Sequence, residues 1–190
     1  MSGLLQGKKV LVTGAGRGIG LAIARQFAAQ GAALWLNGRD DVEIARVAEA
    51  LHADFGVSCL PLCFDVAEPK AVKQAFQRLF TETRQLDVLV NNAGILDDAL
   101  IGMVQQQQIE RTFSTNSYST LYCSQYAARL MQRAGGGQCH QHDIDYWSGG
   151  KFGPSCLCRQ QGGSDRYYPV TGQGAGCQPD PGQCHCPGFY

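Results

Sequence analysis

The stretch Thr13-Gly14-Ala15-Gly16-Arg17-Gly18-Ile19-Gly20 decides the fold of this chain. It ends a short apolar run at Lys9–Thr13, which predicts a buried strand, and it opens a helical pattern of apolar residues from Ile19 to Ala28. Glycines at such a junction allow a tight turn and a close approach of the backbone to a phosphate group. The helix that follows points the positive end of its dipole at the same place. The sequence therefore predicts a phosphate-binding loop, with an ordinary strand-to-helix turn as the alternative.

The same alternation of strand and helix patterns continues along the chain. Further strands are expected at 33–36, 57–64 and 86–90, and helices are expected at 42–55, 72–80 and, as one long segment, at 109–133. Strands that alternate with helices indicate a parallel sheet with helices on both faces. We therefore expect an α/β fold with a doubly wound, Rossmann-type parallel sheet.

The composition excludes several classes of protein. The chain has 190 residues, enough for one domain, and its formal net charge is zero with 17% charged residues. This balance argues against a nucleic-acid or membrane-surface binder that works through gross charge. No apolar run reaches the length of about 18 residues that indicates a membrane span, and the N-terminus does not resemble a signal peptide. We expect a cytoplasmic protein with no nucleic-acid or membrane partner.

The composition changes abruptly near residue 138. Six of the nine cysteines fall between Cys139 and Cys186, and the remaining chain from Gln138 is almost free of aliphatic residues. Such a segment cannot bury a useful core. We therefore divide the chain into a dinucleotide-binding core at 1–137, a scrambled segment at 138–186 and a short end at 187–190.

Four motifs follow one another in the first 137 residues. The glycine spacing of residues 14–20 is the first, and the Asp65-Val66 pair after the third expected strand is the second. Asn91-Asn92-Ala93-Gly94 after the fourth strand is the third, and Asn116 in the long helical segment is the fourth. Together they resemble the short-chain dehydrogenase/reductase family, and the resemblance runs without a break from Gly7 to about Gly137.

The resemblance implies a role for each of these residues. A nicotinamide dinucleotide would be held by the loop residues Gly14, Gly16, Arg17, Gly18, Ile19 and Gly20. Asp65 and Val66 would hold its adenine, and Asn92, Ala93 and Gly94 would line the cofactor channel. Asn116 would support a water-mediated proton relay, and it is the candidate catalytic residue. The structural alternatives are a strand-ending turn for Asn91–Gly94 and a helix-surface or kink residue for Asn116.

The residues after the second expected strand favour NADP(H) over NAD(H). A carboxylate at this place would bind a ribose 2′-hydroxyl and repel a 2′-phosphate, but the chain has Asn37-Gly38-Arg39 there. Arg17 supplies a second guanidinium nearby, and guanidinium groups suit phosphate. The opposing possibilities are that Asp40 or Asp41 turns toward the site, or that Arg39 is only a solvated loop charge.

The catalytic pattern that the resemblance implies is missing. The family uses a serine, a tyrosine thirteen residues later as general acid, and a lysine four residues further that lowers the pKa of the tyrosine. No Tyr-x-x-x-Lys exists in the chain, and Tyr146 and Lys151 are five residues apart. The family's Pro-Gly motif returns at Pro187-Gly188, which are therefore candidate cofactor contacts.

A change of reading frame would explain why the pattern disappears and returns. When the degenerate codons from Gln138 onward are read one nucleotide later, one permitted translation begins Asn-Val-Ile-Asn-Met-Thr-Ser. The serine codon then straddles Ile144 and Asp145, the tyrosine codon straddles Leu157 and Cys158, and the lysine codon straddles Gln161 and Gly162. These positions have the family spacing. We therefore predict one inserted base near codon 138 and one lost base near codon 186.

The resemblance points most closely to the 3-oxoacyl-[acyl-carrier-protein] reductase branch, through Asn91–Gly94 followed by Ile95–Leu100. It implies an NADPH-dependent oxidoreductase of fatty acid biosynthesis that reduces a small-molecule or carrier-protein-linked carbonyl. As printed, the chain lacks the acid and some sixty residues of the usual family length. The family is often homotetrameric, but the segment 138–186 is scrambled, so the resemblance does not imply an oligomeric state for this chain.

Two alternatives remain open. The first is a catalytically dead dinucleotide-binding protein, although the strand expected after Gly137 is missing and would leave the sheet with an unpaired edge. The second is a zinc-binding tail. Its candidate ligands are Cys139, His140, His142, Cys156, Cys158, Cys184, His185 and Cys186. The Cys-x-Cys spacing of its pairs is unlike that of a zinc knuckle, so we expect no metal site.

Overall fold

The structure is a computed structural model that describes residues 3–141, 151–152 and 166–171. Within these residues the main sheet has the strand order β3-β2-β1-β4-β6-β8. Its strands are β1 (Lys9–Val12), β2 (Ala33–Gly38), β3 (Cys59–Cys63), β4 (Val88–Asn91), β6 (Gly136–Gln141) and β8 (Arg166–Thr171). β6 runs parallel to β4, whereas β8 is antiparallel to β6. The expected parallel α/β sheet is confirmed, and the ends of the four predicted strands differ from the prediction by at most two residues.

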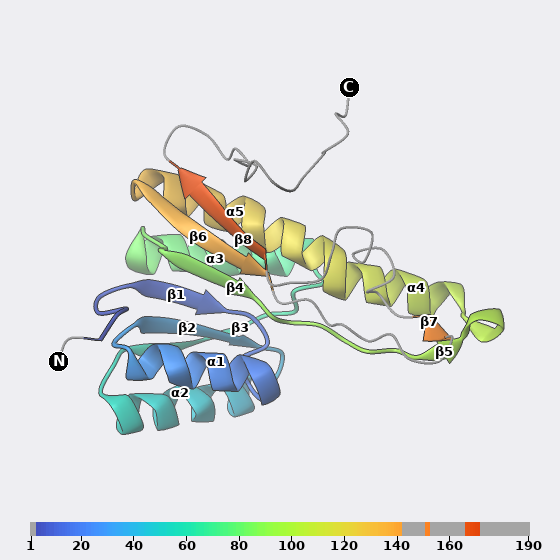
Figure 1. Cartoon of the computed structure of the whole chain (residues 1–190), viewed down its shortest axis with the longest axis horizontal. Helices are drawn as coiled ribbons and strands as arrows, with labels where there is room; N and C mark the ends of the chain where they lie inside the picture. The colour runs from blue at the N-terminus through green and yellow to red at the C-terminus, as the bar shows by residue number, and fades with distance from the viewer. Residues whose placement is uncertain (1–2, 142–150, 153–165, 172–190) are drawn as a thin grey trace.

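Helices cover both faces of this sheet, as Figure 1 shows. The helices are α1 (Gly18–Ala29), α2 (Asp41–Phe55), α3 (Pro69–Thr83), α4 (Gln106–Phe113) and α5 (Ser119–Arg133). A π-helical turn, η2 (Ser114–Tyr118), joins α4 to α5, and a 3-10 turn, η1 (Ile101–Met103), precedes α4. A separate antiparallel pair consists of β5 (Ala99–Leu100) and β7 (Lys151–Phe152).

Alternate residues of the central strands enter two different cores. Val10 and Val12 of β1 pack with α1 and α2, whereas Leu11 between them packs with α3 and α5. Trp35 of β2 joins Leu11, and its neighbours Leu34 and Leu36 face the other way. Because side chains alternate along a strand, a run without polar residues is what a sheet covered on both faces requires.

The long helical segment begins earlier than the sequence pattern indicated. Its apolar spacing predicted a start at Ile109, but α4 begins at Gln106 because the backbone N–H of Gln105 donates to Gln108 Oε1 at 3.0 Å. A glutamine that reaches back in this way satisfies an amide that the helix itself leaves free. The segment then continues to Arg133.

The expectation of a missing strand after Gly137 is wrong. Residues 136–141 form β6, which pairs with β4 in the register Leu89↔Cys139, and β8 lies on its other side. Two features explain this: Cys139 is only 5% exposed and joins the core, and a methyl group on Gly137 would lie 2.5 Å from Met131 Cγ. The absence of a side chain at Gly137 therefore lets the strand approach α5.

In the part of the chain that the structure describes, none of the helices combines the length and the apolar character needed to cross a bilayer.

Candidate functional site

The glycine-rich loop lies where the strand order reverses. From β1 the chain moves outward to β2 and β3, and it then returns to β4 on the opposite side of β1. β1 and β4 are parallel neighbours with Val12 opposite Val90, so the loops that follow them leave the same edge of the sheet side by side. Ligands of open α/β sheets bind at this switch point. The topology thus brings the predicted loop and the Asn91–Gly94 motif together.

Two glycines allow the loop to pack against the segment after β4. Gly14 has a φ of +64°, and a methyl group built on it would lie 2.9 Å from the Cα of Ala93. A methyl group on Gly20 would overlap the carbonyl oxygen of Gly14 and lie 2.5 Å from Asn92 Nδ2. Larger residues at these two positions would force the loop away from Asn92 and Ala93.

Thr13 connects the two segments through its hydroxyl group. Its Oγ1 donates to the carbonyl oxygen of Val90 at 3.2 Å and accepts from the backbone N–H groups of Asn92 and Ala93 at 2.9 and 3.0 Å. Asn92 Nδ2 returns the contact by donating to the carbonyl oxygens of Thr13 and Gly14, at 3.0 and 3.2 Å. Thr13 was not among the predicted site residues. The sequence signal that could have indicated Thr13 is its position as a polar residue at the end of an apolar strand.

Asn37 at the end of β2 holds the loop from the other side. Its Oδ1 accepts from the N–H of Gly14 at 3.3 Å, and its Nδ2 donates to the carbonyl oxygens of Leu62 and Phe64 at 3.2 and 2.9 Å. Asn37 is 2% exposed, so these bonds satisfy an amide that water does not reach. The sequence analysis treated Asn37 only as the residue found where a carboxylate would indicate NAD(H), and it missed this positioning role.

The amino end of α1 has no side-chain cap among the described residues. Its N-cap residue Arg17 makes no side-chain capping bond, and the first turn, which contains Gly18, Ile19 and Gly20, carries no acidic residue. α2 differs, because Asp40 Oδ1 accepts from the N–H of Glu43 at 3.0 Å. An uncapped helix end beside a glycine loop suits the pyrophosphate of a dinucleotide. The residues present therefore fit that group.

Arg17 and Arg39 are both exposed, and neither forms an ion pair with any residue that the structure describes. Asp40, which could have turned toward the site, is instead the N-cap of α2. Both guanidinium groups are thus available to a phosphate.

Asp65 and Val66 shape the turn between β3 and α3. Asp65 Oδ1 accepts from the N–H of Ala67 at 2.9 Å, and the carbonyl oxygen of Asp65 accepts from Glu68. Val66 is 5% exposed and packs in the core beside α3. The contact of this pair with adenine stays a prediction.

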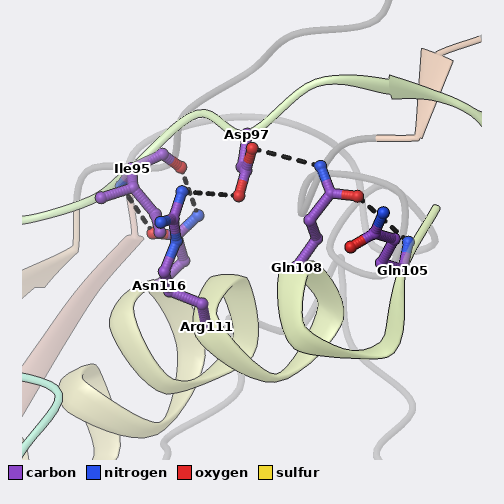
Figure 2. Close-up of polar contacts among 6 residues, drawn as sticks. All are labelled: Ile95, Asp97, Gln105, Gln108, Arg111 and Asn116. Atoms are coloured by element: carbon purple, nitrogen blue, oxygen red, sulfur yellow. Dashed lines mark hydrogen bonds and ion pairs between the residues drawn. The ribbon is translucent and has the colours of Figure 1, made fainter.

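Asn116 ties the long helical segment to the loop after β4, as Figure 2 shows. Its Oδ1 accepts from the N–H of Ile95 at 2.8 Å, and its Nδ2 donates to the carbonyl oxygen of Ile95 at 2.9 Å. Asn116 lies in the π-helical turn η2. Such turns often occur at functional sites, so the structural interpretation as a kink residue and the functional interpretation are compatible. The proton-relay role stays a prediction.

A second contact fixes the same loop two residues later (Figure 2). Asp97 Oδ2 accepts from Arg111 Nη2 at 2.6 Å, and Asp97 Oδ1 accepts from Gln108 Nε2 at 3.3 Å. Asn116 and Asp97 together hold the segment from Ile95 to Asp97 against α4 and η2.

Several candidate residues fall outside the described residues. These are Pro187, Gly188 and Tyr146, together with most of the candidate zinc ligands. Within the described ranges no three His, Cys, Asp or Glu side chains gather in a way that could hold a metal ion. Cys139 itself is buried, with its Sγ 3.9 Å from Met131 Sδ. Burial raises the pKa of this thiol to about 11.

Comparisons with known proteins agree with this geometry. The sequence profile of the short chain dehydrogenase family matches residues 8–139. General stress protein 39 of Bacillus subtilis is 36% identical over 124 residues, which cover 65% of this chain and 43% of that protein. The 3-oxoacyl-[acyl-carrier-protein] reductase of Chlamydia trachomatis is 34% identical over 137 residues, which cover 72% of this chain and 55% of that protein.

Solved structures show the same fold. The L-sorbose reductase of Gluconobacter frateurii, complexed with NADPH and L-sorbose, has a TM-score of 0.68 at 29% identity, with 71% of this chain and 51% of that chain covered. A short chain dehydrogenase of Burkholderia cenocepacia in complex with NADP has a TM-score of 0.62 at 36% identity, with 66% of this chain and 51% of that chain covered.

The chain spans about half the length of the curated relatives it matches. The matched half contains the glycine-rich loop, the Asn91–Gly94 motif and Asn116, held together by the contacts described above. On the family profile, the relatives and this geometry, the chain belongs to the short chain dehydrogenase family.

Proposed function

We propose that residues 8–139 form the dinucleotide-binding part of an NADP(H)-dependent oxidoreductase. The observation that carries the proposal is the packing of Gly14 and Gly20 against Asn92 and Ala93 beside the uncapped end of α1. The exposed Arg17 and Arg39 favour NADP(H) over NAD(H). The complexes of two similar structures with NADPH and NADP support the same choice.

The proposed reaction is the reduction of a carbonyl group. The bound nicotinamide would supply a hydride. Residues of this chain would bind and orient: the loop after β1 would hold the phosphates, and Asn92–Gly94 would line the channel beside the nicotinamide. Asn116 would keep that channel in place through its two bonds to Ile95. The sequence contains no Tyr-x-x-x-Lys motif, which would supply the family's acid, so we expect the printed chain to bind dinucleotide without turnover.

The composition of β6 supports the proposed change of reading frame. A parallel strand inside a doubly covered sheet is normally rich in Val, Ile and Leu. β6 lies between β4 and β8, yet it reads Gly-Gly-Gln-Cys-His-Gln and only Cys139 is buried. The shifted reading from codon 138 begins Asn-Val-Ile-Asn-Met-Thr, which suits such a strand better. We therefore propose that the gene encodes the serine, tyrosine and lysine in the shifted frame.

For the substrate we propose a 3-oxoacyl group, free or linked to a carrier protein. The similar proteins include 3-oxoacyl-[acyl-carrier-protein] reductases from three organisms. A sorbitol dehydrogenase and a gluconate 5-dehydrogenase match to a similar extent. A sugar or polyol carbonyl is therefore the second candidate. If the gene reads as printed, we propose that the chain binds a dinucleotide but does not catalyse a reaction.

The test compares two proteins after the gene has been resequenced across codons 130–190. One is the printed chain, and the other is the product with the shifted frame restored. NADPH and NADH binding are measured by titration calorimetry, and turnover is measured by NADPH consumption with a 3-oxoacyl thioester and with a ketose.

We expect both proteins to bind NADPH more tightly than NADH and only the restored protein to turn over the thioester. A printed chain that binds neither dinucleotide would contradict the binding proposal. A restored protein that reduces only the ketose would contradict the substrate, and one that reduces nothing would contradict the change of frame.

A further inference from the structure

Glu43 of α2 brings a carboxylate to the phosphate-binding loop. A methyl group built on Gly16 would lie 3.2 Å from Glu43 Oε2 and 3.4 Å from the carboxyl carbon of the same side chain. Glu43 therefore lies against the second glycine of the loop, although the two are 27 positions apart in the sequence. None of the sequence motifs indicated this contact.

The local structure of α2 leaves this carboxylate uncommitted. Asp40 and Glu43 have the spacing of a capping box, in which each side chain accepts from the backbone N–H of the other residue. Only one half is made among the described hydrogen bonds: Asp40 Oδ1 accepts from the N–H of Glu43 at 3.0 Å. Glu43 also forms no ion pair within the described part of the chain. Its charge is thus free to act on a ligand.

The two arginines of the proposed site belong to the same two segments as this contact. Arg17 follows Gly16 directly, and Arg39 directly precedes the cap residue Asp40 of the helix that carries Glu43. A 2′-phosphate would be attracted by Arg17 and Arg39 and repelled by Glu43. A ribose 2′-hydroxyl carries no charge and can donate a hydrogen bond to a carboxylate.

We propose that Glu43 is a specificity-determining residue that weakens the preference for NADP(H) and lets NAD(H) compete for the site. The proposal rests on the dinucleotide site described under the proposed function. It adds that the choice between the two dinucleotides is a balance between two arginines and one carboxylate. Because Glu43 is exposed, water and salt screen its effect, and a modest fold-change is expected.

The experiment replaces the carboxylate by its neutral isostere, Glu43→Gln, in the full chain. Glu49→Gln is the matched control, because Glu49 is an exposed residue of the same helix and its replacement makes the same change of charge. Dissociation constants for NADPH and NADH are measured by titration calorimetry at low salt and at about 0.5 M salt. Thermal unfolding checks that both variants are folded.

We expect Glu43→Gln to raise the ratio of NADPH affinity to NADH affinity by about three- to ten-fold at low salt, and less at high salt. Glu49→Gln should change the ratio by less than about two-fold, because an exposed charge further from the ligand is screened. Equal effects of the two variants would overturn the proposal, since the charge of the whole helix would then matter and not the position of Glu43.

A Glu43→Gln variant that binds NADPH and NADH more tightly by the same factor would also overturn the proposal, because Glu43 would then act on the pyrophosphate that both dinucleotides share. If the unaltered chain binds neither dinucleotide, the proposed function itself fails. That result differs from a chain that binds both but does not respond to Glu43→Gln.

Discussion

Polar residues at the ends of buried strands fix the position of the candidate site. Thr13 is 2% exposed, and its hydroxyl group uses its single proton and both of its acceptor positions within the protein. Asn37 uses Oδ1 and Nδ2 in the same way. Because an unpaired buried polar group costs about 1–3 kcal/mol, these residues hold the loop in one conformation. A preorganised loop loses less entropy when a ligand binds.

At the same scale we predict that Gly20→Ala weakens dinucleotide binding and destabilises the chain. The added methyl group would overlap the carbonyl oxygen of Gly14, which belongs to the backbone and cannot rotate away. The loop must then shift, with an expected loss of about 1–3 kcal/mol of stability and at least about ten-fold in NADPH affinity. Chemical denaturation and calorimetric titration measure the two losses.

Gly102→Ala is the control for this variant. Gly102 lies in η1, and among the described residues beyond its chain neighbours a methyl group there would meet no atom within 4 Å. It should leave both stability and NADPH affinity close to those of the unaltered chain. If Gly20→Ala behaves like Gly102→Ala, the close packing of the loop against Asn92 is not what forms the site.

Among the elements, the π-helical turn explains how Asn116 reaches the loop after β4. A π turn contains one more residue than an α-helical turn, so it rotates the side chains that follow it relative to the preceding helix. The apolar spacing of the segment predicted one continuous helix and could not reveal this local change. Asn116 was found from the family resemblance alone. Its two bonds to Ile95 came from the structure.

We predict that Asn116→Ala loosens the segment from Ile95 to Asp97. The variant leaves the N–H and carbonyl groups of Ile95 without their partners, which should cost about 1–3 kcal/mol locally. Hydrogen exchange of the peptide that contains Ile95 should then accelerate about ten-fold or more. Mass spectrometry of exchanged peptides measures this change.

Gln125→Ala is the corresponding control, because Gln125 is an exposed residue of α5 whose side chain makes no hydrogen bond in the described part of the chain. Its exchange pattern should match that of the unaltered chain. Unchanged exchange at Ile95 in the Asn116→Ala variant would mean that Asp97, through Arg111 and Gln108, holds the segment by itself.

Sequence reasoning worked best where periodicity and glycine spacing carry the information. The parallel sheet, the loop after β1 and the Asn91–Gly94 motif could all be read from local patterns. Contacts between distant residues could not, because no local pattern encodes them: Asn37 with Gly14 and Glu43 with Gly16 are examples. β6 was missed for a different reason, since a strand made of Gly, Gln, Cys and His has no strand-like composition.

For the molecule as a whole, β6 determines whether the sheet continues beyond β4. Pairing with β4 places Cys139 beside Met131 of α5, in the core that α3 and α5 share. Strand β8 then covers the outer edge of β6, which would otherwise offer unpaired N–H and carbonyl groups to another chain. The state of Cys139 therefore reports on this half of the fold.

We predict that Cys139 resists alkylation in the native chain. Burial raises the pKa of Cys139 to about 11 and that of Cys123 to about 12, so at pH 8 only about 0.1% or less of either thiol is the reactive thiolate. Among the four thiols that the structure describes, Cys63 is exposed at the end of β3 and should react first, although partial burial and the nearby Asp41 and Asp40 raise its pKa as well. Peptide mapping by mass spectrometry after timed alkylation gives the rate at each site.

Cys123 and Cys63 serve as internal references for this measurement. In the native chain Cys139 should follow the slow rate of Cys123, and in denaturant all three thiols should react at similar rates. Raising the pH should speed alkylation of each thiol, because a raised pKa keeps the thiol protonated until the pH approaches it. If Cys139 instead reacts in the native chain as fast as Cys63, β6 does not pair with β4 in solution. The ordered sheet would then end at β4, and the dinucleotide site would have to form without the support of β6 behind α5.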